Sequence, residues 1–291
     1  MTDLLDNLPH PLLAPVIDLA RQAGEAILPF WRANVSVTSK ADDSPVTAAD
    51  LAAHQVLVEG LLALDPAIHV LSEEDADIPL SERATWERWW LVDPLDGTKE
   101  FISGSEEFTV NVALIERGRV VFGVVSMPTN DRCYFGGAEL GAWRSDSPGH
   151  CEPIQVRHEL QAGQPFTVVA SRRHSSPEQE HLLAGLAGGL GHLLAGLAAG
   201  LGPLQLTNIG SSLKFCLLAE GAADCYPRLA PTSQWDTAAA QGVLEGAGGE
   251  VLQLDGQRFT YPARESLLNP FFLALPARAE WREKLLVLAQ S

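Results

Sequence analysis

The sequence predicts an α/β protein with an α+β N-terminal half and an α/β C-terminal half. In the first half, two apolar patterns at helical spacing precede a meander of long apolar strands, which is typical of an α+β unit. After a polar stretch at 145–165, strands and helices alternate, which is typical of an α/β layer. We therefore place the domain boundary there, with an N-terminal domain at 1–158 and a C-terminal domain at 159–291.

Apolar spacing and turn residues define the elements of the first half. The first helical pattern stops at Pro29, a second begins after Pro45, and Arg117 and Gly118 join two long strands into a hairpin. The buried strand WWLVD stops at a PLDG turn. We expect helices at 12–27 and 46–62, and strands at 89–93, 109–116 and 119–126.

The second half begins with the strand FTVVAS, and helical and strand patterns then alternate to the C-terminus. We expect strands at 166–171, 250–254 and 271–275, and helices at 181–202, 211–221, 235–249 and 281–288. The helix at 181–202 is a tandem repeat, HLLAGLAGGLG followed by HLLAGLAAGLG. Its leucines fall on one face, so we expect an amphipathic surface helix with a break near its glycines, and no membrane span.

The charge balance excludes several classes of function. The chain has 20 basic and 37 acidic residues, a formal net charge of −17 over 291 residues. Nucleic-acid binders and polybasic membrane anchors need clustered Lys and Arg, so neither is expected. Asp3 and Asp6 stand where a signal peptide needs positive charge, which predicts a cytoplasmic protein and leaves peripheral association with the inner face of the membrane open. The four cysteines form no CxxC pair and are expected to be buried free thiols.

Carboxylates on separate elements are the main chemical signal. With no local Lys or Arg to neutralise them, they would repel one another unless a cation lay between them. Hard divalent ions take oxygen ligands, and Mg²⁺ typically combines a few carboxylates with water and substrate phosphate. The acidic residues are Asp50 in PVTAAD, Glu73 and Glu74 in SEED, Asp93 and Asp96 in DPLDGT, and Asp236 in WDTAA.

Each of these motifs also has a structural explanation of its own. Thr47 and Asp50 have the spacing of a capping box, and Asp236 has the setting of a helix N-cap. SEED alone fits a solvated loop, and DPLDGT alone fits an ordinary turn. Their joint occurrence favours a metal site.

The DPLDGT motif itself predicts a metal site beside an anion site. Its proline and glycine hold a tight turn that can direct Asp93, Asp96 and the Leu95 carbonyl at one point. Gly97 and Thr98 then offer backbone N–H groups and a hydroxyl at the start of the next segment. No Ser, Cys or His nucleophile is needed beside such a site.

Four motifs together resemble the inositol monophosphatase superfamily of metal-dependent, lithium-sensitive phosphomonoesterases. These are SEED at 72–75, LVDPLDGTKEF at 91–101, GSSLKFC at 210–216 and WDTAA at 235–239. Within the superfamily, SPVTAAD, VLSEED, NIGSSLKF and YPR are similar to the bacterial CysQ-type 3'(2'),5'-bisphosphate nucleotidases. The resemblance extends from about Leu12 to about Phe272, departs from the family at the repeat, and implies a layered αβαβα sandwich.

The resemblance also implies roles for single residues. It assigns two Mg²⁺ ions to Glu73, Asp93, the Leu95 carbonyl, Asp96 and Asp236, with Asp93 bridging, and a third ion near Asp50. Gly97 and Thr98 would hold the scissile phosphate, and Asp50 and the Thr98 hydroxyl would orient or deprotonate the attacking water. Glu74 would support the ligands from behind.

A nucleotide bisphosphate carries a second phosphate, which needs a cationic contact of its own. Lys214 and Arg228 are our candidates, with Arg172 as a third; Lys214 also fits a lysine that extends from its helix to solvent. Together with Glu73, Leu95, Asp96, Gly97, Thr98 and Asp236, the first two are expected to contact substrate.

Three hypotheses follow. The first is a Mg²⁺-dependent phosphatase that converts adenosine 3',5'-bisphosphate to AMP and phosphate, with 3'-phosphoadenylyl sulfate as an alternative substrate. The second keeps the fold and metals and acts on inositol monophosphate or another sugar phosphate. The third is a non-catalytic sensor of phosphorylated metabolites.

Overall fold

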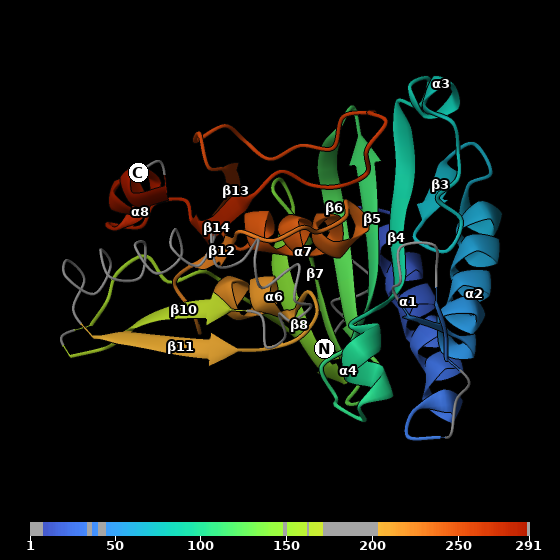
Figure 1. Ribbon diagram of the computed structural model, residues 1–291, viewed down its shortest axis with the longest axis horizontal. Coiled ribbons are helices and arrows are strands. Elements are labelled where there is room, and N and C mark those ends of the chain that lie inside the picture. The colour runs from blue at the N-terminus through green and yellow to red at the C-terminus, as the bar shows by residue number, and fades with distance from the viewer. Residues whose placement is uncertain are drawn as a thin grey trace.

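Five layers of alternating helices and strands make up the fold, as the sandwich expected from the resemblance requires (Figure 1). The computed structural model describes residues 8–33, 37–39, 45–147, 150–161, 163–170 and 203–289. In order, the layers are α1 (Leu13–Ile27) with α2 (Ala48–Leu64); a seven-stranded sheet; α6 (Leu213–Ala219) with α7 (Trp235–Gly246); a three-stranded sheet; and α8 (Arg282–Ala289).

The seven-stranded sheet is formed by the first half of the chain. Its first two strands are parallel and all its other neighbours are antiparallel. The predicted hairpin is confirmed, whereas the strand expected to stop at Asp93 continues to Asp96 with an irregular register. In spatial order the strands are β3 (His69–Ser72), β4 (Arg88–Asp96), β5 (Thr109–Glu116), β6 (Arg119–Met127), β7 (Arg132–Gly137), β8 (Gly141–Ser147) and β9 (His150–Pro153).

Helices α1 and α2 cover one face of this sheet because their apolar residues recur at helical spacing. Leu13, Ile17 and Leu57 are fully buried and belong to one cluster with Trp90 and Phe122 of the sheet. Fully burying such a side chain contributes about 1.5–3 kcal/mol. The apolar pattern of the first half therefore predicts this face correctly.

Helix α7 lies directly on the other face, where small residues allow the close approach. A Cβ atom at Gly123 of β6 would lie 1.9 Å from the carbonyl oxygen of Ala239, so any larger residue there would displace the helix. Ala238, Ala239 and Ala240 are buried in this contact. The packing fixes the position of Asp236 in the first turn of α7.

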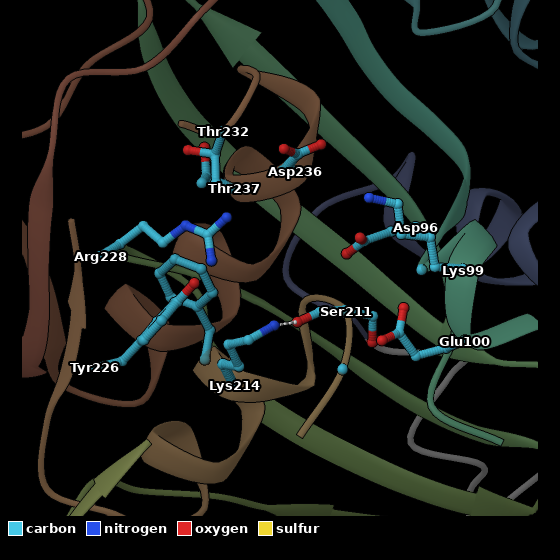
Figure 2. A pocket seen from close by; sticks show the side chains of 13 residues that line it. Asp96, Lys99, Glu100, Ser211, Lys214, Tyr226, Arg228, Thr232, Asp236 and Thr237 are labelled. Carbon is cyan, nitrogen blue, oxygen red and sulfur yellow. Dashed lines mark hydrogen bonds between the residues drawn. The ribbon is translucent and has the colours of Figure 1, made fainter. Parts of the chain in front are cut away.

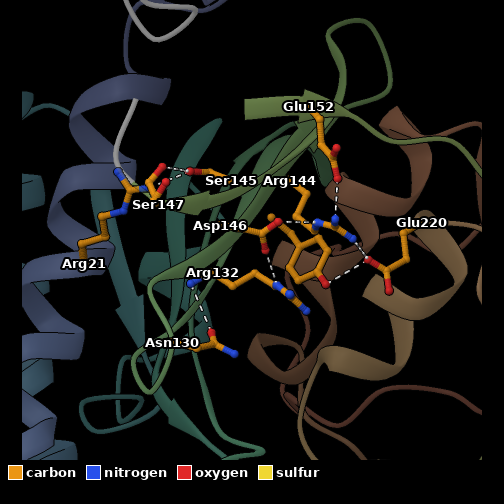
Figure 3. Close-up of polar contacts among 10 residues, drawn as sticks. Arg21, Asn130, Arg132, Arg144, Ser145, Asp146, Ser147, Glu152 and Glu220 are labelled. Atoms are coloured by element: carbon orange, nitrogen blue, oxygen red, sulfur yellow. Dashed lines mark hydrogen bonds and ion pairs between the residues drawn. The ribbon is translucent and has the colours of Figure 1, made fainter. Parts of the chain in front are cut away.

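Ionic contacts attach the C-terminal end of α6 to the large sheet (Figure 3). Arg144 of β8 donates through Nη1 to Glu220 Oε2 at 2.8 Å, and the Tyr134 hydroxyl donates to the same oxygen at 3.1 Å. Arg144 also contacts Asp146 and Glu152. The opposite end of this short helix carries Ser212 and Lys214, so these contacts help to hold both in place.

The second half forms two small sheets. Strands β10 (Phe166–Ala170) and β11 (Leu204–Asn208) are parallel, whereas β12 (Tyr226–Arg228), β14 (Phe272–Pro276) and β13 (Gly249–Gln253) are antiparallel in that order. The remaining short elements are η2 (Leu28–Phe30), β1 (Val37–Ser39), β2 (Pro45–Thr47), α3 (Leu80–Arg83) and α4 (Thr98–Ile102). The proposed boundary at residue 158 stays a prediction.

Three further expectations concern the termini, the repeat and the cysteines. The segment at 181–202 and Arg172 lie outside the described residues, as do Asp3 and Asp6. In the described part of the chain, each helix is too short or too polar to span a membrane. All four cysteines are free; Cys133, Cys216 and Cys225 are buried as expected, but Cys151 is only half-buried.

Candidate metal and phosphate site

The DPLDGT motif forms a turn at the end of the buried strand β4. The Leu95 backbone N–H donates to Asp93 Oδ1 at 3.1 Å, and Gly97 adopts a left-handed φ of 94°. A Cβ atom on Gly97 would lie 3.0 Å from the Glu107 carbonyl oxygen, so both the turn and the close approach favour glycine. Helix α4 then starts at Thr98.

Glu73 lies beside Asp93 because β3 and β4 are parallel neighbours. Ser72 pairs with Val92, and the Glu73 backbone N–H donates to the Val92 carbonyl at 3.0 Å. Parallel strands end at the same edge of a sheet, so residues that follow them lie close together. Glu74 is half-buried in the same turn, and its supporting role stays a prediction.

Asp93 and Asp236 feel the negative charges of carboxylates from three elements. Asp93 is 1% exposed, and burial, followed by the negative charges of Glu73, Asp96 and Asp236, raises its pKa well above its usual value. Burial, followed by Asp96 and Glu73, also raises the pKa of Asp236. These directions agree with mutual repulsion among four of the six acidic residues that the sequence indicates, and the site itself stays a prediction.

The donors at this site fit a hard cation. Carboxylates and the Leu95 carbonyl supply oxygen, the ligand atom that Mg²⁺ prefers, and a divalent ion would offset the repulsion that raises these pKa values. In the described part of the chain, no three acidic, histidine or cysteine side chains are arranged to hold an ion as they stand. The ligand set therefore stays a prediction.

Asp50 takes part in two interactions that the sequence presented as alternatives. Its Oδ2 accepts hydrogen bonds from Thr47 N at 2.8 Å and Thr47 Oγ1 at 2.6 Å, which completes the capping box of α2. Its Oδ1 accepts a longer hydrogen bond, 3.4 Å, from Thr98 Oγ1, which also lies 3.3 Å from the Leu95 carbonyl. The cap thus fixes one oxygen of Asp50 and leaves the other facing Thr98.

A cavity of about 170 Å³ opens beside the carboxylates (Figure 2). Asp96, Lys99 and Glu100 from the first half form one wall, and residues from the second half form the other. Five predicted site residues line it: Asp96, Gly97, Lys214, Arg228 and Asp236. The other six do not: Asp50, Glu73, Glu74, Asp93, Leu95 and Thr98.

Two cations lie on the C-terminal wall, where the sequence predicted them. Lys214 is 6% exposed, its Nζ donates to the Ser211 carbonyl at 2.7 Å, and burial lowers its pKa to about 8. This burial argues against the solvent-extended alternative. Arg228 donates through Nε to the Ala230 carbonyl at 3.1 Å and through Nη2 to the Pro231 carbonyl at 3.0 Å.

The cavity also contains residues that the sequence analysis did not select. Lys99, Glu100, Ser211, Tyr226, Thr232 and Thr237 line it. Asn111 and Ser212 lie behind it and bind Asp96. Several of these residues belong to the motifs DGTKEF, GSSLKF and YPR. The motifs could therefore have identified them, whereas a search for acidic and basic clusters did not.

The chain as a whole is similar to known proteins of one family. The model of the inositol monophosphatase family matches residues 8–290. The "3'(2'),5'-bisphosphate nucleotidase CysQ" of Salmonella typhimurium is 48% identical over 264 residues, covering 90% of this chain and 98% of the relative. The protein of the same name from Aggregatibacter actinomycetemcomitans is 37% identical over 263 residues, covering 90% and 91%.

Solved structures agree in fold. The crystal structure of CysQ from Bacteroides thetaiotaomicron has a TM-score of 0.70 and 37% identity, and the match covers 91% of this chain and 97% of that one. The suhB protein from Bartonella henselae has a TM-score of 0.72 at 22% identity, with 95% and 97% coverage, and so supports the fold alone.

Proposed function

Because the chain belongs to the inositol monophosphatase family, we propose that it is a Mg²⁺-dependent phosphatase that removes the 3'-phosphate of adenosine 3',5'-bisphosphate. The products would be AMP and inorganic phosphate. The relatives that match at high identity and nearly full coverage are named 3'(2'),5'-bisphosphate nucleotidases, which supports this choice of substrate class.

One observation carries the proposal: the same cavity is lined by two proposed metal ligands, Asp96 and Asp236, and by two cations of the second half, Lys214 and Arg228. Asp96 and Asp236 border it, Asp93 and Glu73 affect the same cluster electrostatically, and Lys214 and Arg228 face it from α6 and β12 (Figure 2). A substrate with two phosphates can place one near the acidic cluster and the other against the cations. An inositol monophosphate has no second phosphate that could bind to Lys214 and Arg228.

The proposed ligands for two Mg²⁺ ions are Glu73, Asp93, the Leu95 carbonyl, Asp96 and Asp236. When bound, such ions lower the pKa of an attacking water and stabilise the leaving oxygen of a phosphate ester. A third ion near Asp50 remains part of the proposal.

The remaining steps are assigned to this chain's own residues. Backbone N–H groups of Gly97 and Thr98, at the start of α4, would bind the oxygens of the scissile phosphate. The Thr98 hydroxyl would orient the attacking water. Asp50 Oδ1, which accepts a hydrogen bond from the Thr98 hydroxyl, would accept a proton from that water. Lys214 and Arg228 would bind the 5'-phosphate.

Phosphate release from adenosine 3',5'-bisphosphate tests the proposal. We expect turnover with Mg²⁺, none with a chelator, inhibition by added Li⁺, and a loss of about 10²-fold or more in Asp96→Asn. Asp255→Asn, an exposed acid in the turn after β13, is the matched control and should behave as wild type. Equal rates in wild type and Asp96→Asn would refute the mechanism.

A substrate panel separates the finer alternatives. We propose 3'-phosphoadenylyl sulfate as a second substrate, because its 5' end also carries an anionic group for Lys214 and Arg228. Preferential hydrolysis of inositol monophosphate would favour the sugar phosphatase hypothesis. Binding of the bisphosphate without turnover would favour a sensor.

A further inference from the structure

Two buried polar residues hold a single oxygen of Asp96. Asn111 of β5 donates through Nδ2 to Asp96 Oδ2 at 3.2 Å, and Ser212 Oγ, just before α6, lies 2.7 Å from the same oxygen. Asn111 is 1% exposed and Ser212 is 2% exposed. Within the described part of the chain, Asp96 Oδ1 receives no such hydrogen bond, although Asp96 lines the cavity.

The two residues also hold each other, which fixes the direction of the contact. Asn111 Nδ2 donates its second proton to Ser212 Oγ at 2.9 Å. The single hydroxyl proton of Ser212 is therefore directed away from Asn111, toward Asp96 Oδ2 and the Asp236 carbonyl oxygen, which lies 2.9 Å away. A charge-assisted bond to the carboxylate is the stronger of these two interactions.

The two hydrogen bonds donated by Asn111 leave its own side-chain oxygen in an unfavourable environment. Its Oδ1 is buried and has no hydrogen-bond partner among the described residues. Burying an unpaired acceptor is unfavourable, and the reverse amide orientation would place that oxygen against the carboxylate of Asp96. The side chain thus uses both of its N–H groups, one on Asp96 and one on Ser212, at the expense of its oxygen.

The three residues come from distant parts of the chain. Asp96 and Asn111 belong to adjacent strands of the large sheet, whereas Ser212 precedes α6 and contacts the first turn of α7. The network therefore joins two of the proposed ligands, Asp96 and Asp236, across the two halves of the molecule. A change in either half would alter the orientation of Asp96.

We propose that Asn111 and Ser212 are positioning residues that hold Asp96 Oδ2, so that Oδ1 is presented to Mg²⁺. This proposal rests on the function proposed above, because it concerns the same metal site. Partners that orient a metal ligand typically change metal affinity by about 10- to 100-fold when they are removed. We expect effects of that size on Mg²⁺ binding, with kcat at saturating Mg²⁺ changed less.

The test is a Mg²⁺ titration followed by thermal unfolding, with the metal alone and no substrate. Asn111→Leu keeps the approximate size of the side chain and removes its donors, and Ser212→Ala removes the hydroxyl. We expect both to need about 10- to 100-fold more Mg²⁺ for half of the stabilisation. Ser212→Thr retains the hydroxyl and should restore much of the affinity.

Thr109→Val is the matched control. Thr109 lies on the same strand, pairs with Asp96 through the backbone, and is fully buried, but its Oγ1 has no hydrogen-bond partner among the described residues. Removal of the Thr109 hydroxyl should leave the affinity for Mg²⁺ unchanged. If Asn111 had a purely structural role, Asn111→Leu would lower the unfolding temperature of the metal-free protein. The Mg²⁺ concentration that gives half of the stabilisation would then stay unchanged.

The outcomes distinguish this proposal from the proposed function. A Mg²⁺ response in wild type that is unchanged in Asn111→Leu and Ser212→Ala overturns the positioning role alone. If either variant fails to fold, the Mg²⁺ affinity of Ser212→Thr is compared with that of wild type instead. A large loss of Mg²⁺ affinity in Ser212→Thr, which retains the hydroxyl, would contradict the proposal. No Mg²⁺ response in wild type would overturn both.

Discussion

The Nζ of Lys214 donates to the carbonyl oxygen of Ser211 at 2.7 Å, although the lysine side chain is almost fully buried. A buried cation needs compensating partners, and here a carbonyl, the nearby carboxylate of Asp96 and the ring of Tyr226 provide them. Because Lys214 lies on the cavity wall, the second phosphate of a bisphosphate would bind favourably beside its positive charge.

Lys214→Met should weaken the binding of a bisphosphate more than that of a monophosphate. Loss of a charged hydrogen bond predicts a rise in KM of about 10- to 100-fold for adenosine 3',5'-bisphosphate. The KM for adenosine 3'-monophosphate, which lacks the 5'-phosphate, should change little. Steady-state kinetics on both substrates check this, with Lys284→Met in α8 as the control; equal KM changes for the two substrates would count against a 5'-phosphate role.

The double role of Asp50 predicts two separable effects. Thr47→Ala should lower the free energy of unfolding by about 1 kcal/mol through the loss of the helix cap and leave kcat within severalfold. Asp50→Asn should in addition lower kcat by about 10²-fold or more, because it removes the proposed proton acceptor. Denaturant unfolding and kcat, measured on the same preparations, separate the two; a similar kcat in both variants would assign Asp50 to capping alone.

Metal removal should destabilise the protein through the repulsion within the carboxylate cluster. At a Mg²⁺ concentration of 100 times the dissociation constant, binding contributes about 2.7 kcal/mol, which raises Tm by several degrees. Asp236→Asn should lose this response and, without metal, be at least as stable as wild type. Scanning calorimetry with MgCl₂ and with chelator tests this, and a wild-type Tm that is indifferent to Mg²⁺ would contradict it.

The pH dependence of stability should show the effect of Glu245 in α7. Burial raises its pKa even though Gln241 Nε2 donates to Oε1 at 2.9 Å. Because the folded-state pKa is raised, the folded protein retains a proton that the unfolded chain has lost, so stability falls as pH rises from about 4.3 through the folded pKa. Glu245→Gln should therefore be increasingly more stable than wild type over that range.

Unfolding free energies of wild type and Glu245→Gln at pH 4, 6 and 8 provide the check. A difference that is constant with pH would show that Glu245 ionises in the folded protein as it does in the unfolded chain.

The buried ion pair between Arg157 and Asp224 predicts a large loss of stability without a loss of chemistry. Asp224 is fully buried, accepts from Arg157 Nε at 2.8 Å, and also accepts from Thr167 N at 2.7 Å. Arg157→Met leaves this carboxylate without its cation, at a cost of about 3–5 kcal/mol. Urea unfolding measures the loss, and kcat per folded molecule should stay near wild type.

The long amphipathic elements and the acidic motifs could be predicted from sequence because both are local signals. Helices α1 and α2 follow from apolar spacing, α7 follows from its alanine run, and the turn at Asp93 and Asp96 follows from its proline and glycine. The short strands β3, β9 and β12 were not predicted, because three or four residues carry too little periodicity. The longer strands β7, β8 and β11 were also not predicted.

The contacts that complete the site could not be predicted in the same way. Asn111 stands inside an apolar strand pattern, and Ser212 stands at the start of a predicted helix 101 residues further along the chain. Their meeting at Asp96 depends on how α6 and α7 pack on the sheet, for which a single sequence contains no local signal. Lys214 was identified from charge, but its burial depends on the same packing.

The most direct measurement is the product and rate of adenosine 3',5'-bisphosphate hydrolysis with Mg²⁺, compared with inositol monophosphate under the same conditions. We expect one phosphate released per molecule, AMP phosphorylated only at the 5' position, and a kcat/KM about 10²-fold or more above that for inositol monophosphate, because charged hydrogen bonds would bind the second phosphate. Release of the 5'-phosphate, or a higher kcat/KM on inositol monophosphate, would contradict it.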